Sequence, residues 1–438
     1  MASRGRDLVS NATDTQPPGA DARPRAAGAA FWTAAFLVTL ALVVSRRPDG
    51  ITNPQFWAED GKLWYAQAHQ HGLAALALPA AGYLQSFSRL VAGLSLAFDL
   101  RWAPLVFNAA AAIAQTLPPL LLLSGRFAFA IPDLRVRALA ALLWIGAPNG
   151  FEIQSNVTNT QTHLALLALL LVLATPPRTA VGRACDVAVI LLAGFSGPTC
   201  VLLVPVALIA WLHDRERWRL VLLATLLLPA AAQTVTYFTS GGRGREHTEL
   251  GAGQVTFLQI VGGQIVVAGT LGLDGYRALR WLRGWVYPVG AVAAGLAGIA
   301  FVVRALQVSR STPLRLFVLF ATLALAAGLA SPAIAHVPRW EGLRIPGAGV
   351  RYYAPPILAW LATLLWSACS DPSVRVKHLS RAALAAVLLL GLPLDWRVAP
   401  RPDLDFAAHA ARYAAAEPGT VVRIPIPPVG WEMRLEKR

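Results

Sequence analysis

Two adjacent carboxylates, Glu59 and Asp60, lie between Trp57 and Trp64 in the stretch 53–65. Tryptophan side chains favour the boundary between membrane and water, and a carboxylate that is partly desolvated there has a raised pKa. Such a group can accept a proton or hold a divalent cation. The alternative is an acidic pair that caps a short interfacial helix and takes no part in chemistry.

A second polar segment, residues 149–163, lies directly before an apolar run. Asn156, Asn159 and Gln161 carry amide groups, which donate and accept hydrogen bonds as sugar hydroxyls do. His163 begins the apolar run and could bind a phosphate or shuttle a proton. The alternative is that Asn159 caps a helix and that His163 is an ordinary interfacial residue.

Arginines suggest a third group of candidates. Arg339 and Arg351 flank a loop that also contains Tyr352, and Arg351 directly precedes an apolar run. A guanidinium at that level can form two hydrogen bonds with a lipid phosphate, although arginine side chains also extend to the interface without binding anything. Tyr83 and Arg89 follow the acidic pair and could line the same cavity.

Composition indicates which elements must position these residues. The chain has 438 residues, of which 56% are hydrophobic and only 14% are charged, and its mean hydropathy is +0.52. Soluble proteins carry about 25% charged residues, so the sequence predicts an all-α polytopic membrane protein. The net charge of +15 comes largely from arginines between apolar runs, a pattern that sets membrane topology and does not indicate a nucleic-acid partner.

Apolar runs mark the expected helices. They fall at about 29–45, 103–123, 138–149, 160–175, 186–195, 198–212, 219–237, 285–303, 316–335, 353–369 and 382–394. The runs 84–100 and 255–273 are ambiguous, because the first suits a surface helix and the second is Gly- and Gln-rich and suits a re-entrant segment. With both on one side, about 11 spans result, within a range of roughly 10 to 13.

The distribution of basic residues predicts sidedness. The short loops on one side of that arrangement carry most of the arginines, as cytoplasmic loops do. We therefore expect a cytoplasmic N-terminus, a disordered tail over residues 1–28, a membrane domain over 29–394 and a short C-terminal tail over 395–438 on the outer face. The acidic pair and the loops 149–159 and 336–352 then share that outer face. The Ala-, Leu- and Arg-rich composition is typical of a bacterial cytoplasmic (inner) membrane protein.

The whole arrangement resembles the GT-C superfamily of glycosyltransferases, polytopic membrane enzymes that use polyprenyl-phosphate sugars. Their first outer loop carries an acidic pair soon after the first span, which here is Glu59 and Asp60. The turn Ser196-Gly197-Pro198 is similar to a helical hairpin of protein-mannosyltransferase-like members, which usually have lysine where this chain has Ser196. The more local pattern is similar to an uncharacterised bacterial family within the superfamily.

The resemblance implies an inverting sugar transfer that serves the cell envelope. Asp60 is then the expected base and Glu59 the second choice, and either could hold Mg²⁺ or Mn²⁺ if a divalent cation is used; no other cofactor is expected. Arg351, Arg339 or His163 would stabilise the leaving phosphate, and the amide side chains would bind sugar hydroxyls. The expected partners are a polyprenyl-phosphate sugar, membrane lipid and a glycan or lipid acceptor.

Two other functions stay open at this stage. One is a transporter or flippase for a lipid-linked sugar, which needs a polar path through the membrane. The spans at 29–45, 103–123 and 285–303 contain no Asp, Glu, His, Lys or Arg, whereas ion-coupled transporters usually place ionisable residues at mid-membrane. The other is a polysaccharide polymerase or ligase, for which the loops 238–284 and 336–352 would matter more than the acidic pair.

Overall fold

The computed structural model describes residues 28–240, 249–281 and 286–438. The chain is mostly helical, as the composition predicts, and within the described residues its only strands form one two-stranded sheet. The tail expected at 1–28 lies outside the described residues, apart from Gly28.

Among the described residues, seven helices are long and apolar enough to cross a membrane. They are α1 (Ala29–Arg46), the Leu100–Leu123 helix that contains α5 (Ala103–Leu123), α10 (Arg217–Thr239), Gln254–Trp281, α13 (Val286–Val308), α14 (Thr312–Ala330) and Val374–Trp396. Shorter helices also occupy predicted runs: α6 (Leu134–Ile145), α7 (Thr160–Leu173), α8 (Ala180–Phe195), α9 (Thr199–Asp214) and α16 (Ala354–Ser370). These helices support a membrane protein, and the number of spans stays a prediction.

Helix α7 forms the centre of the bundle. From His163 to Leu173 every residue is buried, and the helix packs against α5, α8 and α9. A helix that is apolar on all sides is stable only when neighbours cover all of it. This central position fixes the start of α7 and the polar loop that precedes it.

The loops that join the helices form two groups, one at each end of the bundle. In the hydrogen bonds and ion pairs given below, each loop contacts a partner of its own group. At what we call the Asp60 end, Thr158 bonds to Asp60, Phe87 to Ser196, and Arg351 to Glu152. At what we call the Arg126 end, Thr175 bonds to Arg126, His213 to Thr312, and Arg304 to Asp371. The side of the membrane on which each end lies stays a prediction.

Both ambiguous runs are irregular, and whether either crosses the membrane stays a prediction. Residues 84–100 contain the ten-residue helix α4 (Ser86–Ser95), which packs on α5 and on the turn Asp60–Tyr65. The second run lies in α11 (Gln254–Ile260), the π-helical turn Val261–Val267 and α12 (Ala268–Trp281). Gly272 breaks this segment with a φ of 81°, and the side chain of Tyr276 lies against Gly263. The segment therefore folds back on itself.

Arg46 ties three helices together at the Asp60 end. It ends α1 and is fully buried. Its guanidinium donates to the carbonyl oxygens of Ile145, at 2.6 Å, and Asp395, at 3.1 Å. These carbonyls lie at the C-terminal ends of α6 and of α18 (Leu392–Trp396), where helices have carbonyls without intrahelical partners. The Arg46 guanidinium thus stabilises three converging helix ends.

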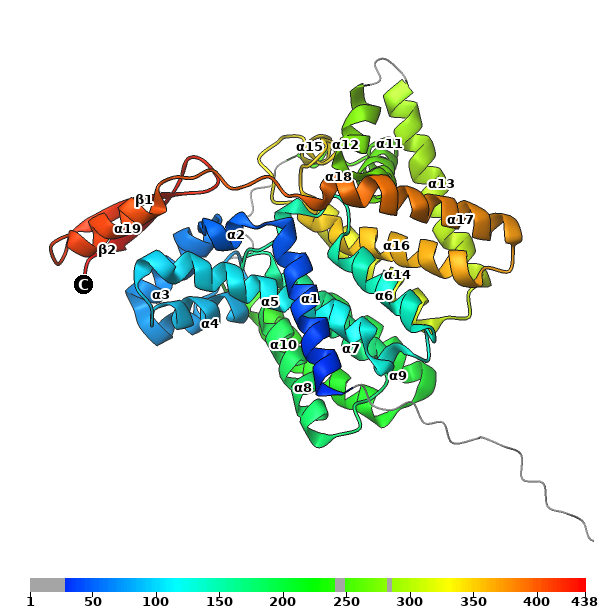
Figure 1. The fold of residues 1–438 in the computed structure, drawn as a ribbon, viewed down its shortest axis with the longest axis horizontal. Helices are drawn as coiled ribbons and strands as arrows, with labels where there is room; N and C mark the ends of the chain where they lie inside the picture. The colour runs from blue at the N-terminus through cyan, green and yellow to red at the C-terminus, as the bar shows by residue number, and fades with distance from the viewer. Residues whose placement is uncertain (1–27, 241–248, 282–285) are drawn as a thin grey trace, which may run out of the picture.

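The first long loop and the C-terminal segment form a small satellite core at the Asp60 end. The loop contains α2 (Asp49–Thr52), the π-helical turn η1 (Asp60–Tyr65), α3 (Ala66–His71) and a 3₁₀ turn (Gly72–Ala77). The segment contains α19 (Phe406–Ala415) and the antiparallel strands β1 (Val421–Ile426) and β2 (Trp431–Glu436). Figure 1 shows the strands and α19 beside α3.

The satellite core explains why the C-terminal segment folds over this loop. Ile424, Ile426 and Met433 are fully buried against Phe56 and Phe107. Both strands place alternate residues into this core, as strand geometry requires. Pro425 is tolerated because the sheet has only two strands, so each strand has a free edge.

Candidate functional site

The acidic turn is held from both sides. Ala58 has a positive φ of 47°, and its N–H donates to the Pro427 carbonyl at 2.6 Å. Asp60 then begins the π-helical turn η1, a conformation that is rare and frequent at functional sites. Gly61 lets the tail approach, since a Cβ there would lie 3.1 Å from Ile426 and Phe56. The turn is therefore built by contacts from the C-terminal segment.

Asp60 is fully buried and accepts three hydrogen bonds. The N–H of Val157 donates at 3.2 Å, the N–H of Thr158 at 2.8 Å and the Thr158 hydroxyl at 2.7 Å. Burial raises the pKa of Asp60 to about 6, although the Thr158 hydrogen bonds and the charge of Arg401 lower it. A carboxylate with this pKa can exchange a proton near neutral pH.

A chain of contacts leads from Asp60 to Arg89. The Trp64 indole N–H donates to the Thr158 hydroxyl at 3.0 Å, and the Arg89 guanidinium lies 4.8 Å from the centre of the Trp64 ring. A cation over an indole face is stabilised by the ring quadrupole. Arg89 is thus linked to Asp60 through Thr158 and Trp64, and a shared cavity stays a prediction.

Arg89 is the least satisfied cation of this region. Its side chain is 1% exposed, and only Nη2 has a described acceptor, the Leu78 carbonyl at 3.1 Å. No group in the described residues accepts a hydrogen bond from its Nε or Nη1. Burial lowers the pKa of Arg89 to about 10, so it stays charged at neutral pH. A buried cation with unused donors favours an anion beside it.

Arg401 is a second buried cation near Asp60, and the sequence analysis did not single it out. It donates to the carbonyls of Gln55, at 2.7 Å, and Ser155, at 2.6 Å, and to the Asn108 side-chain oxygen at 2.9 Å. Burial lowers its pKa to about 9. Arg401 thus links the first loop, α5 and the 149–159 loop, and a positive charge there favours an ionised Asp60.

Glu59 differs from Asp60 in access. Its side chain is half-buried, and no hydrogen bond or ion pair to it is found among the described residues. Asp60 cannot serve a divalent cation well, because three donors already point at its oxygens and the side chain is fully buried. No group of three metal-binding side chains occurs in the described ranges. Of the acidic pair, Glu59 therefore has the more available carboxylate for Mg²⁺ or Mn²⁺.

The amides of the 149–163 loop are used to build the loop. Asn156 and Asn159 both donate to the Glu152 carbonyl, at 2.8 and 3.1 Å, and the Asn156 side-chain oxygen accepts from the Asn159 N–H. Gln161 is half-exposed and lies against Gly197 of the hairpin turn. Of the three predicted sugar-binding amides, only Gln161 has a side chain with surface left for a ligand.

His163 lies within the fold. It is buried, and its Nε2 lies 3.1 Å from the Ile153 carbonyl, while Nδ1 has no described partner. The donor at Nε2 makes this histidine a brace between the start of α7 and the preceding loop. Its placement is that of a structural residue close to the Asp60 network.

Arg351 has a carboxylate partner that the sequence did not indicate. Its guanidinium forms an ion pair with Glu152, and its backbone N–H donates to the same carboxylate at 3.1 Å. Tyr352 accepts from the Ala333 N–H at 2.7 Å, and Arg339 donates to the Pro332 carbonyl at 2.8 Å. These residues brace the 331–353 loop, and Glu152 already balances the charge of Arg351.

Tyr83 lies beside the hairpin turn. It is half-buried in a tight turn with Ala80, and the next residue, Leu84, exchanges hydrogen bonds with the Gln233 side chain. Gln233 also donates to the Gly194 carbonyl at 3.0 Å. The segment before α4 is therefore fixed against the turn that joins α8 and α9.

The described residues thus bring together Glu59, Asp60 and Arg89, with Thr158 and Trp64 as links, and Tyr83 and Gln161 lie around the same hairpin turn. Arg351, Tyr352 and Arg339 form a separate, mutually braced loop that reaches this group only through the 149–159 loop.

Comparison of the chain with protein-family models, with curated proteins and with solved structures finds no match.

Proposed function

We propose that this protein is a membrane glycosyltransferase that transfers a sugar from a polyprenyl-phosphate donor to a glycan or lipid acceptor at its Asp60 end. The observation that carries the proposal is one connected network. It contains a carboxylate whose pKa is raised to about 6 and a buried arginine with two unused donor atoms. Such a pair supplies a proton acceptor and an anion partner, which are the two groups this transfer needs.

The reaction assigns one role to each group. Asp60 accepts the proton of the acceptor hydroxyl, whose oxygen forms a bond to the anomeric carbon of the donor. The bond from that carbon to the phosphate oxygen breaks, and the phosphate leaves with the electron pair. Arg89 stabilises the leaving phosphate by charge-assisted hydrogen bonds. These steps use only side chains of this chain.

The two carboxylates differ in how easily an acceptor hydroxyl can reach them. Asp60 is our first choice as base because its pKa lies near the operating pH, but the acceptor hydroxyl must displace the Thr158 donors to reach it. Glu59 is the second choice because it is more exposed and adjoins the same turn. If Asp60 is the base, Thr158 controls the approach to it.

Orientation is part of the proposal. The arginines of the Arg126 end favour a cytoplasmic location for that end. The Asp60 end then faces outward, in the cytoplasmic membrane of a bacterium, where lipid-linked sugars serve cell-envelope synthesis. The exposed apolar residues Leu90, Leu94 and Phe98 on and after α4 suit a helix that lies at the lipid surface.

The test is sugar transfer from labelled polyprenyl-phosphate monosaccharides in membranes that contain the protein. Asp60→Asn should lower the rate by about 10²–10⁴-fold, the contribution of a general base. Arg89→Gln should lower it by about 10²–10³-fold, the contribution of one anion-stabilising donor group. Asp99→Asn is the matched control, because Asp99 is an exposed carboxylate of the same loop, and it should leave the rate unchanged.

Two results would count against the proposal. Transfer that survives both Asp60→Asn and Glu59→Gln at equal folded expression would remove the acidic pair from the mechanism. If no labelled donor in a complete set gave sugar transfer above background, glycosyl transfer would be ruled out as the function.

A further inference from the structure

Two cavities adjoin each other at the Arg126 end, and one of them extends from there along α6 and α16 as far as Trp144 and Leu358. One has a volume of about 410 Å³ and is lined almost wholly by apolar side chains, among them Trp144, Phe317 and Trp366. The other has a volume of about 380 Å³ and is lined by polar groups that include His213, Arg219 and Arg310. Both volumes fall in the range of ligand sites, roughly 300–1,000 Å³.

The cavities meet along a shared wall. Ala130, Leu173, Ser311 and Pro313 line both of them. The apolar cavity lies between α6, α7, α14 and α16, whereas the polar cavity lies where the ends of α9 and α10 meet the start of α14. An occupant that bridges the two must be apolar over most of its length and polar at one end.

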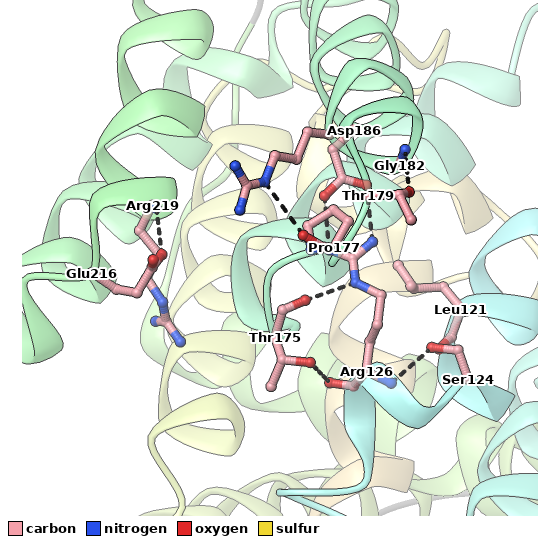
Figure 2. Close-up of polar contacts among 11 residues, drawn as sticks. Leu121, Ser124, Arg126, Thr175, Pro177, Thr179, Gly182, Asp186, Glu216 and Arg219 are labelled. Carbon is pink, nitrogen blue, oxygen red and sulfur yellow. Dashed lines mark hydrogen bonds and ion pairs between the residues drawn. The ribbon is translucent and has the colours of Figure 1, made fainter. Parts of the chain in front are cut away.

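The charged groups around the polar cavity are paired within the protein. Figure 2 shows Arg126 in a two-pronged ion pair with Asp186, with Nη1 and Nη2 at 2.9 and 2.7 Å from the carboxylate oxygens. It also shows Glu216 accepting from the Arg219 N–H. The Arg219 guanidinium is 3.1 Å from Asp214, and His213 bonds to Thr312. These groups are already satisfied within the protein.

Arg310 is the exception. It lines the polar cavity and is exposed, and no hydrogen bond or ion pair to its guanidinium occurs in the part of the chain that the structure describes. In the neighbouring cavity the Trp144 indole N–H also has no described hydrogen-bond partner, although it is buried. The polar cavity therefore offers a free cation with a planar fork of donors, which suits a phosphate.

We infer that the two cavities form one binding site for a lipid with an acidic phosphate headgroup, with the phosphate at Arg310 and an acyl or prenyl chain in the apolar cavity. The inference is independent of the proposed function, because the phosphate would lie at Arg310, at the opposite end of the bundle from Asp60. The headgroup could be that of a membrane phospholipid or of a polyprenyl phosphate, which share the charge and the donor preference.

Tryptophan fluorescence provides the test, because Trp144 and Trp366 line the apolar cavity. The full chain is placed in neutral detergent micelles with bromine-labelled phosphatidylglycerol or phosphatidylcholine, and quenching is measured. The difference between the wild type and a Trp144→Phe, Trp366→Phe variant isolates these two of the 14 tryptophans. We expect tighter quenching of this pair by phosphatidylglycerol than by phosphatidylcholine.

Arg310→Gln should reduce that preference by about fivefold, which is about 1 kcal/mol for one basic residue near an anionic lipid at 1.4 kcal/mol per tenfold. Arg375→Gln is the matched control, because Arg375 is an exposed arginine of the same end that lines neither cavity. An equal preference in the two variants, or no preference in the wild type, would overturn the inference.

A second variant and a competition complete the design. Ala362→Phe fills the apolar cavity and should abolish the selective quenching of Trp144 while Arg310 remains; unchanged quenching in the folded variant would place the lipid elsewhere. Competition by unlabelled lipids then separates the two sources. Stronger displacement by a polyprenyl phosphate than by phosphatidylglycerol identifies a single-chain phosphate monoester, and the reverse order identifies a membrane phospholipid.

Discussion

Replacing Asp60 with asparagine should make the stability of the fold less dependent on pH. A rise in the Asp60 pKa from 3.8 to about 6 means that the folded state binds the proton more tightly than the unfolded chain, by about 3 kcal/mol. This stabilisation is present in full below about pH 4 and is lost as the pH rises through about 6. Asparagine cannot ionise, so the variant lacks this loss.

The measurement is unfolding by sodium dodecyl sulfate in neutral detergent, followed by tryptophan fluorescence, on the wild type and Asp60→Asn. Between about pH 5 and pH 8 the wild type should lose about 1.4 kcal/mol relative to the variant, the part of the linkage that titrates in this window. Other groups titrate equally in both proteins, so their contributions cancel in the difference.

Thr158→Val provides the matched comparison, because it keeps the shape and removes the hydroxyl that donates to Asp60. Loss of this hydrogen bond should raise the Asp60 pKa further and move the transition to higher pH. The reasoning is refuted if Asp60→Asn and the wild type keep a constant difference between pH 5 and pH 8. It is equally refuted if Thr158→Val moves the transition to lower pH.

Three further results are expected. Initial rates of sugar transfer should fall below about pH 6 as Asp60 takes up a proton, and a flat profile from pH 5 to 8 would exclude it as the base. Arg401→Gln should cost about 3–5 kcal/mol in unfolding free energy because it breaks a buried charged network, whereas the exposed Arg423→Gln should cost less than about 0.5 kcal/mol; equal costs would contradict the assigned role. Gly262→Ala should prevent folding to a monodisperse protein, because its Cβ would lie 1.9 Å from the Ala291 carbonyl oxygen. Gly93→Ala, whose Cβ would have nothing within 4 Å, should instead stabilise α4 by about 0.5–1 kcal/mol. Size-exclusion chromatography and unfolding measurements compare the two variants.

The helices could be predicted because length and apolarity dictate them. The runs 29–45 and 103–123 correspond to α1 and α5 within a residue. The local shape of the runs 84–100 and 255–273 could not be predicted from composition, because contacts with other segments determine it. Helix α4 is held against the first loop, and Tyr276 lies against Gly263 across the break at Gly272.

The candidate site was predictable only in part. The neighbourhood of Asp60 and Arg89 follows from their closeness in the chain, and the polar loop supplies Thr158. The partner of Arg351 did not follow, because Glu152 lies 199 positions away. Likewise, Asn156 and Asn159 were expected to face a ligand, but the carbonyl of Glu152 in the bent loop takes both donors, since a buried carbonyl needs a partner.

The dependence of the first loop on Arg401 has a consequence for biosynthesis. Gln55 and Arg401 are 346 positions apart, so at about 5–20 residues per second the loop waits on the order of 20–70 seconds for its partner. By the end of that interval the helices from α1 to α18 have been made, but until then the carbonyls that Arg401 satisfies are without it. The site thus matures after the bundle, and a nascent chain halted before residue 401 would contain the bundle's helices without an assembled acidic turn.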